Sequence, residues 1–111
     1  MKTKSILFLL CFIALSVFAQ QVVKVVSFKV YGNCGMCKTT IENALHIPSV
    51  KAVNWNPDTK ILKIKFDESQ ISLDSLHKRI IAVGYDTDQY STSDTAYASL
   101  HKCCKYERKK K

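Results

Sequence analysis

The chain has 111 residues, a length typical of one domain. Apolar residues make up 47% of it, which is enough for a packed core and excludes a wholly disordered chain. With only 3 glycines and 2 prolines, a collagen-like or linker-like protein is also excluded. The 17 basic and 9 acidic residues give a net charge of +8.

The N-terminal segment, residues 1–19, has the composition of a secretory signal peptide. Lys2 and Lys4 form a short basic start, a nearly all-apolar run follows, and the run ends in a Val-Phe-Ala stretch of the kind that signal peptidase reads. The apolar run is shorter than the roughly 20 residues that a membrane-spanning helix needs. We therefore expect cleavage between Ala19 and Gln20, and a secreted or periplasmic protein.

Much of the positive charge of the remaining chain lies in the tail after Cys104, which ends in Arg108-Lys109-Lys110-Lys111. The rest of the exported chain is closer to neutral, which argues against nucleic acid as a partner. A basic run can touch an anionic membrane surface, but such runs are more commonly solvated. We expect a solvated tail.

The first half of the chain predicts a strand, a helix and two further strands. Alternating apolar residues indicate a strand over residues 22–31, and apolar residues at helical spacing indicate a helix over residues 37–46. Pro48 ends this helix. A second strand is predicted over residues 50–55, and residues 60–66 form the clearest strand pattern after a Pro-containing turn.

In the second half, Ser72 is a suitable N-cap for a second helix and Gly84 suits its C-terminal end. Residues 85–90 predict a short last strand. The order β-α-β-β-α-β is that of the ferredoxin-like fold, an antiparallel four-stranded sheet with two helices on one face. The predicted fold class is therefore α+β, with residues 20–90 as the domain and residues 91–111 as a C-terminal extension.

One cysteine pair carries the main candidate chemistry. Cys34 and Cys37 stand in a Cys-Gly-Met-Cys loop at the start of the first helix, where free N–H groups, the helix dipole and Lys38 all lower the pKa of a thiol. Two thiolates at this spacing can approach one ion from opposite sides, which suits Cu(I) or another soft ion. We interpret both as metal ligands. Met36 more commonly packs than binds metal.

The stretch Gly32-Asn33-Cys34-Gly35-Met36-Cys37-Lys38-Thr39-Thr40-Ile41-Glu42 resembles the metal loop of the heavy-metal-associated (HMA) domain family, which includes copper chaperones and the periplasmic mercury-binding protein. The resemblance covers residues 22–90 and includes Gly84-Tyr85-Asp86. It implies the βαββαβ fold, Cys34 and Cys37 as ligands, and Cu(I) or Hg(II) as the ion. It also implies a membrane metal transporter, such as a P-type ATPase, as partner. We expect a monomer while no metal is bound.

The sequence departs from the family at one point. The family pattern G-M-x-C-x-x-C places Met before the first cysteine and packs it under the loop. Here Met36 lies between the two cysteines. The packing role of the family's Met therefore passes to Met36 or is lost, and the departure bears on metal preference more than on metal binding.

The tail motif His101-Lys102-Cys103-Cys104 offers further candidate ligands. A last strand of about six residues spans about 20 Å, and a return helix of about ten residues beginning at Asp94 covers about 15 Å. Cys103 and Cys104 can therefore come back beside the first pair, with Tyr97 and Leu100 packing on the domain. Three or four thiolates would favour Zn(II), Cd(II) or a copper cluster. The alternative is a tail with a local disulfide or free thiols.

A thiol–disulfide redox protein is the main alternative function, because Cys34 and Cys37 also resemble the Cys-Gly-x-Cys centre of thioredoxin-like proteins. Against it, the element order lacks the thioredoxin βαβ start, and no Trp precedes Cys34. An inert disulfide between the two cysteines is a third interpretation.

Other polar residues predict no second site. His46 and His77 fall on helices without a partner motif and are interpreted as surface residues. The spacing of the acidic residues after Gly84 does not fit a calcium loop, and no hydrolase, zinc-protease or phosphate-loop motif is present. We therefore expect a metal chaperone or scavenger rather than an enzyme.

Overall fold

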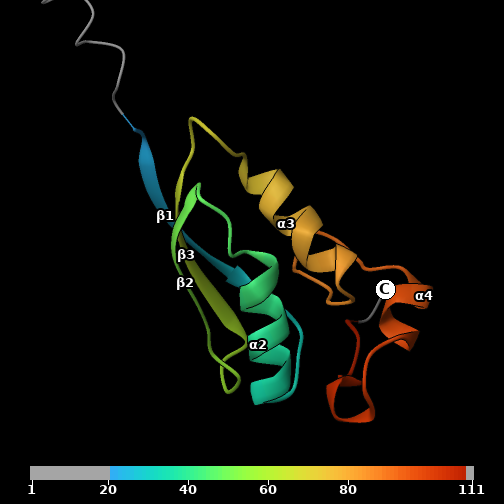
Figure 1. Ribbon diagram of the computed structural model, residues 1–111. Coiled ribbons are helices and arrows are strands. Elements are labelled where there is room, and N and C mark those ends of the chain that lie inside the picture. The colour runs from blue at the N-terminus through green and yellow to red at the C-terminus, as the bar shows by residue number, and fades with distance from the viewer. Residues whose placement is uncertain (1–20, 110–111) are drawn as a thin grey trace, which may run out of the picture.

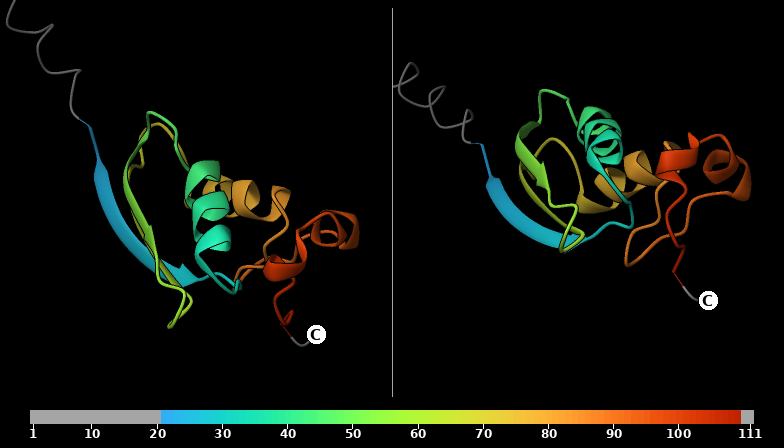
Figure 2. Two further views of the ribbon diagram at one scale, coloured as in Figure 1. Left: turned by 60° about the horizontal axis from the view of Figure 1, so that its bottom comes forward. Right: turned by 90° about the horizontal axis from the view of Figure 1, so that it is seen from below.

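The computed structural model describes residues 21–109, so the predicted signal peptide lies outside the described part of the chain. A three-stranded sheet carries two helices on one face, and the C-terminal segment folds back beside them (Figure 1; Figure 2). In chain order the elements are β1 (Val23–Lys29), α2 (Gly35–Ala44), β2 (Val50–Trp55), β3 (Ile61–Asp67), α3 (Leu73–Ala82), α4 (Asp94–Ala98) and the 3-10 turn η2 (Lys102–Cys104). This arrangement confirms the predicted α+β class. Within residues 21–109, no helix combines the length and apolar character that crossing a membrane requires.

The sheet is antiparallel, with β3 between β1 and β2. Along β3, Leu62, Ile64 and Phe66 are buried, while the two lysines between them face solvent. Alternating burial of this kind is what a sheet covered on one face requires, and the strand predicted over residues 60–66 is confirmed. The buried row faces the helices and forms the centre of the core.

Both helices turn an apolar stripe toward the sheet. Helix α2 buries Ile41, and α3 buries Leu76 and Ile80. Ser72 caps α3 as predicted, because its hydroxyl oxygen accepts a hydrogen bond from the N–H of Ser75. Both predicted helices are confirmed, although α2 begins earlier than expected.

Gly84 turns the chain out of α3 and lets α4 approach. Its φ of 101° lies in the region that favours glycine, as expected at a helix C-terminus. A Cβ at this position would lie 2.9 Å from the carbonyl oxygen of Ala96 in α4. Helix α4 begins at Asp94 as predicted, but it has 5 residues and not about ten, and it is capped by Ser93, whose side chain accepts from the N–H of Ala96.

The prediction that His77 is a surface residue is wrong. Its exposed fraction is 1%, and its ring stacks on Phe28 with 4.0 Å between the ring centres. Its Nδ1 lies 2.8 Å from Oγ1 of Thr87. The polar partner comes from a separate segment, so helical spacing alone does not reveal this burial. His46 is exposed as predicted, but it lies two residues beyond the last residue of α2 and not on the helix.

The predicted fourth strand is not formed in the described chain. Thr87 makes a single bridge with Val30, and the N–H groups of Gln89 and Tyr90 then donate to its hydroxyl oxygen. Side-chain bonds of this kind favour a turn over a ladder. The chain therefore turns back at the end of β1 nearest the cysteine loop instead of running along the strand.

The C-terminal segment is part of the packed domain and not a solvated tail. Cys104 and Tyr106 are each only 2% exposed and belong to the main core cluster. Tyr97 and Leu100 pack against this cluster, as predicted. The expectation of a solvated basic run is wrong for its described part, because Lys109 Nζ donates to two backbone carbonyl groups.

Candidate metal centre

Cys34 is the N-cap residue of α2, so its side chain projects from the end of the helix where the N–H groups are free. Its backbone is extended, with φ −139° and ψ −172°, and its carbonyl oxygen accepts the helical hydrogen bond from the N–H of Lys38 at 3.0 Å. The sulfur makes no capping bond. It is half-buried and remains available to a ligand.

Cys37 lies one turn further along α2 and is fully buried. Burial alone would raise the pKa of this thiol, but N–H groups of Cys34 and Asn33 and the hydroxyl of Tyr85 outweigh it and lower the pKa. The N–H of Asn33 donates directly to Sγ of Cys37 at 3.4 Å. The loop therefore favours the thiolate form, which is the form that binds soft metals.

Trp55 packs against the core side of the cysteine loop. Its side chain is fully buried, and its Nε1 donates to the carbonyl oxygen of Val30 at 2.9 Å. A Cβ on Gly32 would lie 2.9 Å from Cη2 and Cζ2 of this indole. Gly32 occupies the position at which the family pattern has Met, so Trp55 fills that space. Met36 does not take over the packing role, because it is 48% exposed.

Lys38 was predicted to lower the pKa of the two thiols, but its ammonium group bonds elsewhere. Its Nζ donates to Oε2 of Glu42 at 2.6 Å, to Oδ1 of Asn54 at 2.8 Å and to the carbonyl oxygen of Trp55 at 2.8 Å. The same Oε2 of Glu42 accepts from the N–H of Trp55 at 2.9 Å. This network joins α2 to the end of β2 and fixes the helix that carries both cysteines.

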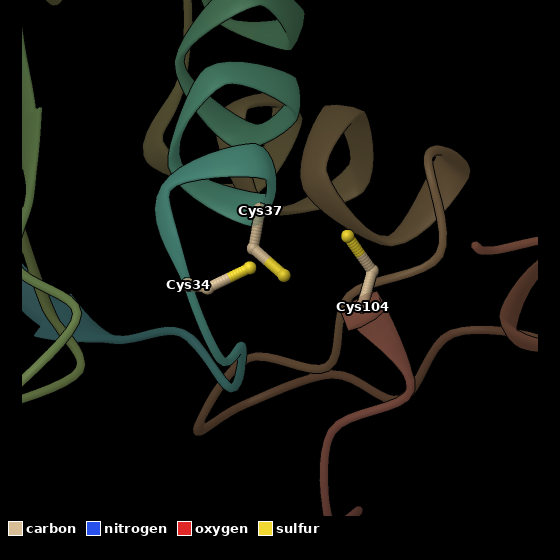
Figure 3. A group of neighbouring side chains, drawn as sticks. All are labelled: Cys34, Cys37 and Cys104. Carbon is tan, nitrogen blue, oxygen red and sulfur yellow. The ribbon is translucent and has the colours of Figure 1, made fainter. Parts of the chain in front are cut away.

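Cys104 brings a third sulfur to the pair. The Sγ atoms of Cys34, Cys37 and Cys104 all lie within 4.8 Å of one another, and Figure 3 shows the third approaching from η2. Three thiolates about 2.3 Å from one ion would be separated by about 4.0 Å, so a small inward movement completes such a site. Burial raises the pKa of Cys104 to about 12, so this thiol carries its proton at neutral pH.

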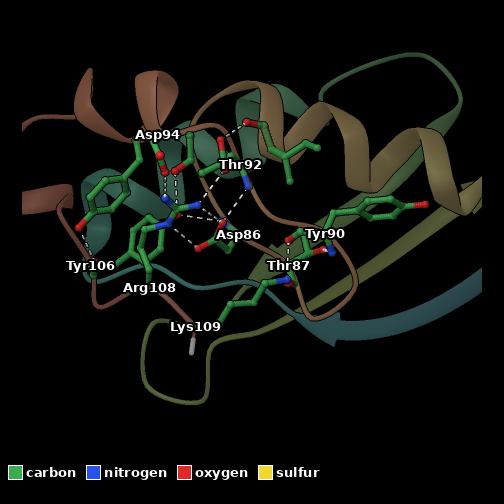
Figure 4. Close-up of polar contacts among 11 residues, drawn as sticks. Asp86, Thr87, Tyr90, Thr92, Asp94, Tyr106, Arg108 and Lys109 are labelled. Atoms are coloured by element: carbon green, nitrogen blue, oxygen red, sulfur yellow. Dashed lines mark hydrogen bonds and ion pairs between the residues drawn. The ribbon is translucent and has the colours of Figure 1, made fainter. Parts of the chain in front are cut away.

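Polar contacts of Tyr106 and Arg108 fix the chain that follows η2 to the segment after α3 (Figure 4). The hydroxyl of Tyr106 donates to the carbonyl oxygen of Gly84 at 2.8 Å and accepts from the N–H of Asp86 at 2.9 Å. Arg108 donates to both carboxylate oxygens of Asp86, at 3.0 and 3.1 Å, and to Asp94 at 2.7 Å. Periodicity did not reveal this anchor, although an acidic residue after Gly84 and a basic residue in the tail were both visible in the sequence.

The other candidate ligands of the tail lie outside the group of three. Cys103 is exposed, with its Sγ 3.9 Å from Sγ of Cys104. His101 is also exposed, and its carbonyl oxygen accepts from the N–H of Cys104 at 2.8 Å. All four cysteines of the described residues are free thiols. Of the three tail residues singled out in the sequence, the structure therefore brings Cys104 to the pair.

The region that contains the cysteine loop and the two main helices matches a known protein family. The family that matches is the heavy-metal-associated domain, over residues 28–86. A comparison with curated protein sequences found no match.

Three solved structures illustrate the likeness. A CopZ metallochaperone is 27% identical, with 58% of this chain and 98% of that chain covered and a TM-score of 0.55. Oxidised MerP from Ralstonia metallidurans is 25% identical, with coverages of 60% and 96% and a TM-score of 0.56. The N-terminal soluble domains of Bacillus subtilis CopA are 25% identical, with coverages of 60% and 47% and a TM-score of 0.56. With its cysteine loop, its α+β fold and the match over more than half its length, the chain belongs to the heavy-metal-associated domain family.

Proposed function

We propose that the protein is an exported carrier or scavenger of a soft heavy-metal ion, Cu(I) or Hg(II), held by the thiolates of Cys34 and Cys37. The main support is the sulfur cluster at the start of α2, within which the Sγ atoms lie no more than 4.8 Å apart. The lowered pKa of Cys37 supplies a thiolate. The similarity to a copper metallochaperone and to MerP supports the choice of ions.

Cys104 is the third ligand in this proposal. Three thiolates would hold Cu(I) or Hg(II) more tightly than two, and they also allow Zn(II) or Cd(II) to bind with a fourth ligand. Cys34 is the most accessible of the three sulfurs, because Cys37 and Cys104 are buried. An incoming thiolate would therefore replace Cys34 first, and the ion would leave by stepwise ligand exchange.

Export and the partner are further parts of the proposal. Export rests on the basic start and apolar run of residues 1–19. A membrane metal transporter of the P-type ATPase class is the proposed partner, supported by the likeness to the N-terminal soluble domains of CopA. The protein would act by binding the metal ion and exchanging its thiolate ligands, and neither step needs a catalytic group.

A Cu(I) titration of the reduced chain beginning at Gln20 tests the site. Competition with a Cu(I)-specific chelator should show a loss of affinity of orders of magnitude in Cys34→Ser and in Cys37→Ser. Thr39→Ala is the matched control, because Thr39 is exposed on the same turn of α2. Wild-type affinity in both cysteine variants would place the metal site elsewhere.

Thiol–disulfide exchange is the second candidate, and the lowered pKa of Cys37 next to two further thiols favours it. It requires the reduced protein to turn over a disulfide substrate at a rate that Cys37→Ser abolishes. We expect little such turnover. Substantial turnover together with no metal uptake would replace the metal-binding proposal.

A further inference from the structure

A second group of sulfur atoms lies beside the three already described. Sγ of Cys103 is 3.5 Å from Sδ of Met36 and 3.9 Å from Sγ of Cys104. Cys104 therefore belongs to both groups, with Cys34 and Cys37 on its inner side and Met36 and Cys103 on its outer side.

The sulfurs of Met36 and Cys103 are exposed, and contacts between η2 and the cysteine loop fix their positions. Met36 is 48% exposed in the first turn of α2, and Cys103 is exposed in η2. The carbonyl oxygen of Cys103 accepts from Nδ2 of Asn33 at 3.4 Å and from the thiol of Cys34 at 3.7 Å. These contacts tie η2 to the cysteine loop, so the approach of Met36 and Cys103 follows from how the tail docks.

The outer group has the donor chemistry of a Cu(I) site. A thioether is a soft, neutral ligand that suits Cu(I) and is a poor ligand for harder ions. Sulfur ligands about 2.3 Å from one ion lie about 4.0 Å apart in a trigonal site. The separations of Cys103 Sγ from Met36 Sδ and from Cys104 Sγ, 3.5 and 3.9 Å, are close to this value.

We propose that Met36, Cys103 and Cys104 form a second, outer Cu(I) position, and that the Cys104 thiolate bridges it to the inner position. The protein then holds two Cu(I) ions, and each cysteine thiol that binds releases its proton to solvent. The exposed outer position receives the ion first. Exchange of Met36 and Cys103 for Cys34 and Cys37, with Cys104 retained throughout, passes it inward. This inference rests on the proposed function and adds a second ion and an entry route to it.

The stoichiometry of Cu(I) binding is the first test. Native mass spectrometry of the reduced chain beginning at Gln20, with free Cu(I) buffered by a chelator, should show two ions bound. Met36→Leu and Cys103→Ser should each lose the outer ion and keep the inner one. His101→Asn is the matched control in the same tail, since His101 belongs to neither sulfur group, and it should still bind two.

A second measurement locates the ion directly. The sequence has 2 methionines, and Met36 is the one that remains after cleavage at Ala19. In selenomethionine-labelled protein the selenium therefore reports on Met36 alone. X-ray absorption at the selenium edge should show a copper neighbour when two ions are bound, and none when Cys103→Ser is loaded in the same way.

The outcomes separate this inference from the proposed function. One ion in the wild type, with no copper next to selenium, overturns the outer position and leaves the inner site standing. Two ions that persist in both Met36→Leu and Cys103→Ser also overturn it. No Cu(I) uptake at all would overturn both proposals.

Discussion

The indole of Trp55 lies directly under the cysteine loop and takes the place of a side chain that the family usually supplies from the loop itself. The exchange works because Gly32 has no side chain, and an added Cβ would be 2.9 Å from the indole. The bond from Nε1 to the carbonyl oxygen of Val30 fixes the ring in this position. The indole therefore leaves no room for a side chain at Gly32.

Gly32→Ala should destabilise the metal-free protein by about 1–3 kcal/mol, the usual cost of overpacking a filled site. Gly35→Ala is the control, because a Cβ there meets nothing within 4 Å. Urea unfolding of the reduced proteins measures both. Equal stability in the two variants would show that Trp55 moves aside without cost.

His77 contributes a pH-dependent part of the stability. Burial lowers its pKa, and Lys109 acts in the same direction, while Asp88 and Asp74 oppose the shift without cancelling it. The unfolded chain therefore takes up this proton at a higher pH than the folded protein does. The stability is fully present above the unfolded pKa of about 6.5 and declines as the pH falls from there through the lowered pKa of the folded state.

Replacing His77 with Phe should remove this component. Between pH 7 and pH 5 the wild type should lose up to about 1.4 kcal/mol per pH unit more than His77→Phe does. His46→Gln removes an exposed histidine and should keep the wild-type dependence. The measurement is urea unfolding at several pH values. An unchanged slope in His77→Phe would mean that another group carries the effect.

At the scale of elements, the turn after Thr87 decides where the C-terminal segment goes. A full last strand would have carried the chain away from the cysteine loop. Instead Thr87 pairs once with Val30, and its hydroxyl closes a turn. The segment then starts beside the loop, and the short helix α4 is enough to bring η2 to the site.

The anchor of that segment is the ion pair between Asp86 and Arg108, whose side chains are 1% and 24% exposed. Burial raises the pKa of Asp86, but the bonds from Arg108 and from the N–H of Thr92 outweigh this and lower the pKa. The stabilisation is present above the unfolded pKa of about 3.9 and is lost as the pH falls through the lowered folded value.

Arg108→Met should cost about 3 kcal/mol at neutral pH, because it leaves a buried carboxylate without its cation. The cost should shrink as the pH falls from about 4 through the lowered pKa of Asp86, because the carboxyl then gains its proton in the folded protein as well. Lys78→Met is the control, since its pair with Asp74 is exposed and contributes only about 0.5 kcal/mol. Thermal unfolding of the metal-free proteins compares them. A cost for Arg108→Met no larger than for Lys78→Met would contradict the anchor.

The sequence predicted elements whose pattern lies within a short stretch of residues. It missed contacts between residues that are far apart in the sequence. Alternation along residues 60–66 and the Ser72 cap each lie within one element, and both were confirmed. The last strand failed because side-chain bonds of Thr87 compete with pairing. The charge of Arg108 looked like part of a solvated run, because its partner Asp86 is 22 positions away and shares no periodicity with it.

At the scale of the whole molecule, the residues that belong to the family and the C-terminal segment form one packed unit. The family match ends at residue 86, yet the core continues into Cys104 and Tyr106. Cys34 and Cys37 were visible in the sequence because their spacing is local. The distance from η2 to the loop could only be bounded by element lengths, and packing decided that Cys104, and not His101, reaches the pair.

Metal binding and docking of the C-terminal segment should be coupled, because Cys104 joins them. A ligand that binds the docked form alone shifts the local opening equilibrium toward that form. Adding Hg(II) or Cu(I) to the reduced chain should therefore slow hydrogen–deuterium exchange at the N–H groups of η2 and α4, as well as in the first turn of α2. In Cys104→Ser the slowing should persist in α2 and disappear in η2 and α4. Equal slowing of η2 in both proteins would mean that the ion affects the segment without the Cys104 thiolate, and that the inner site has two sulfur ligands rather than three.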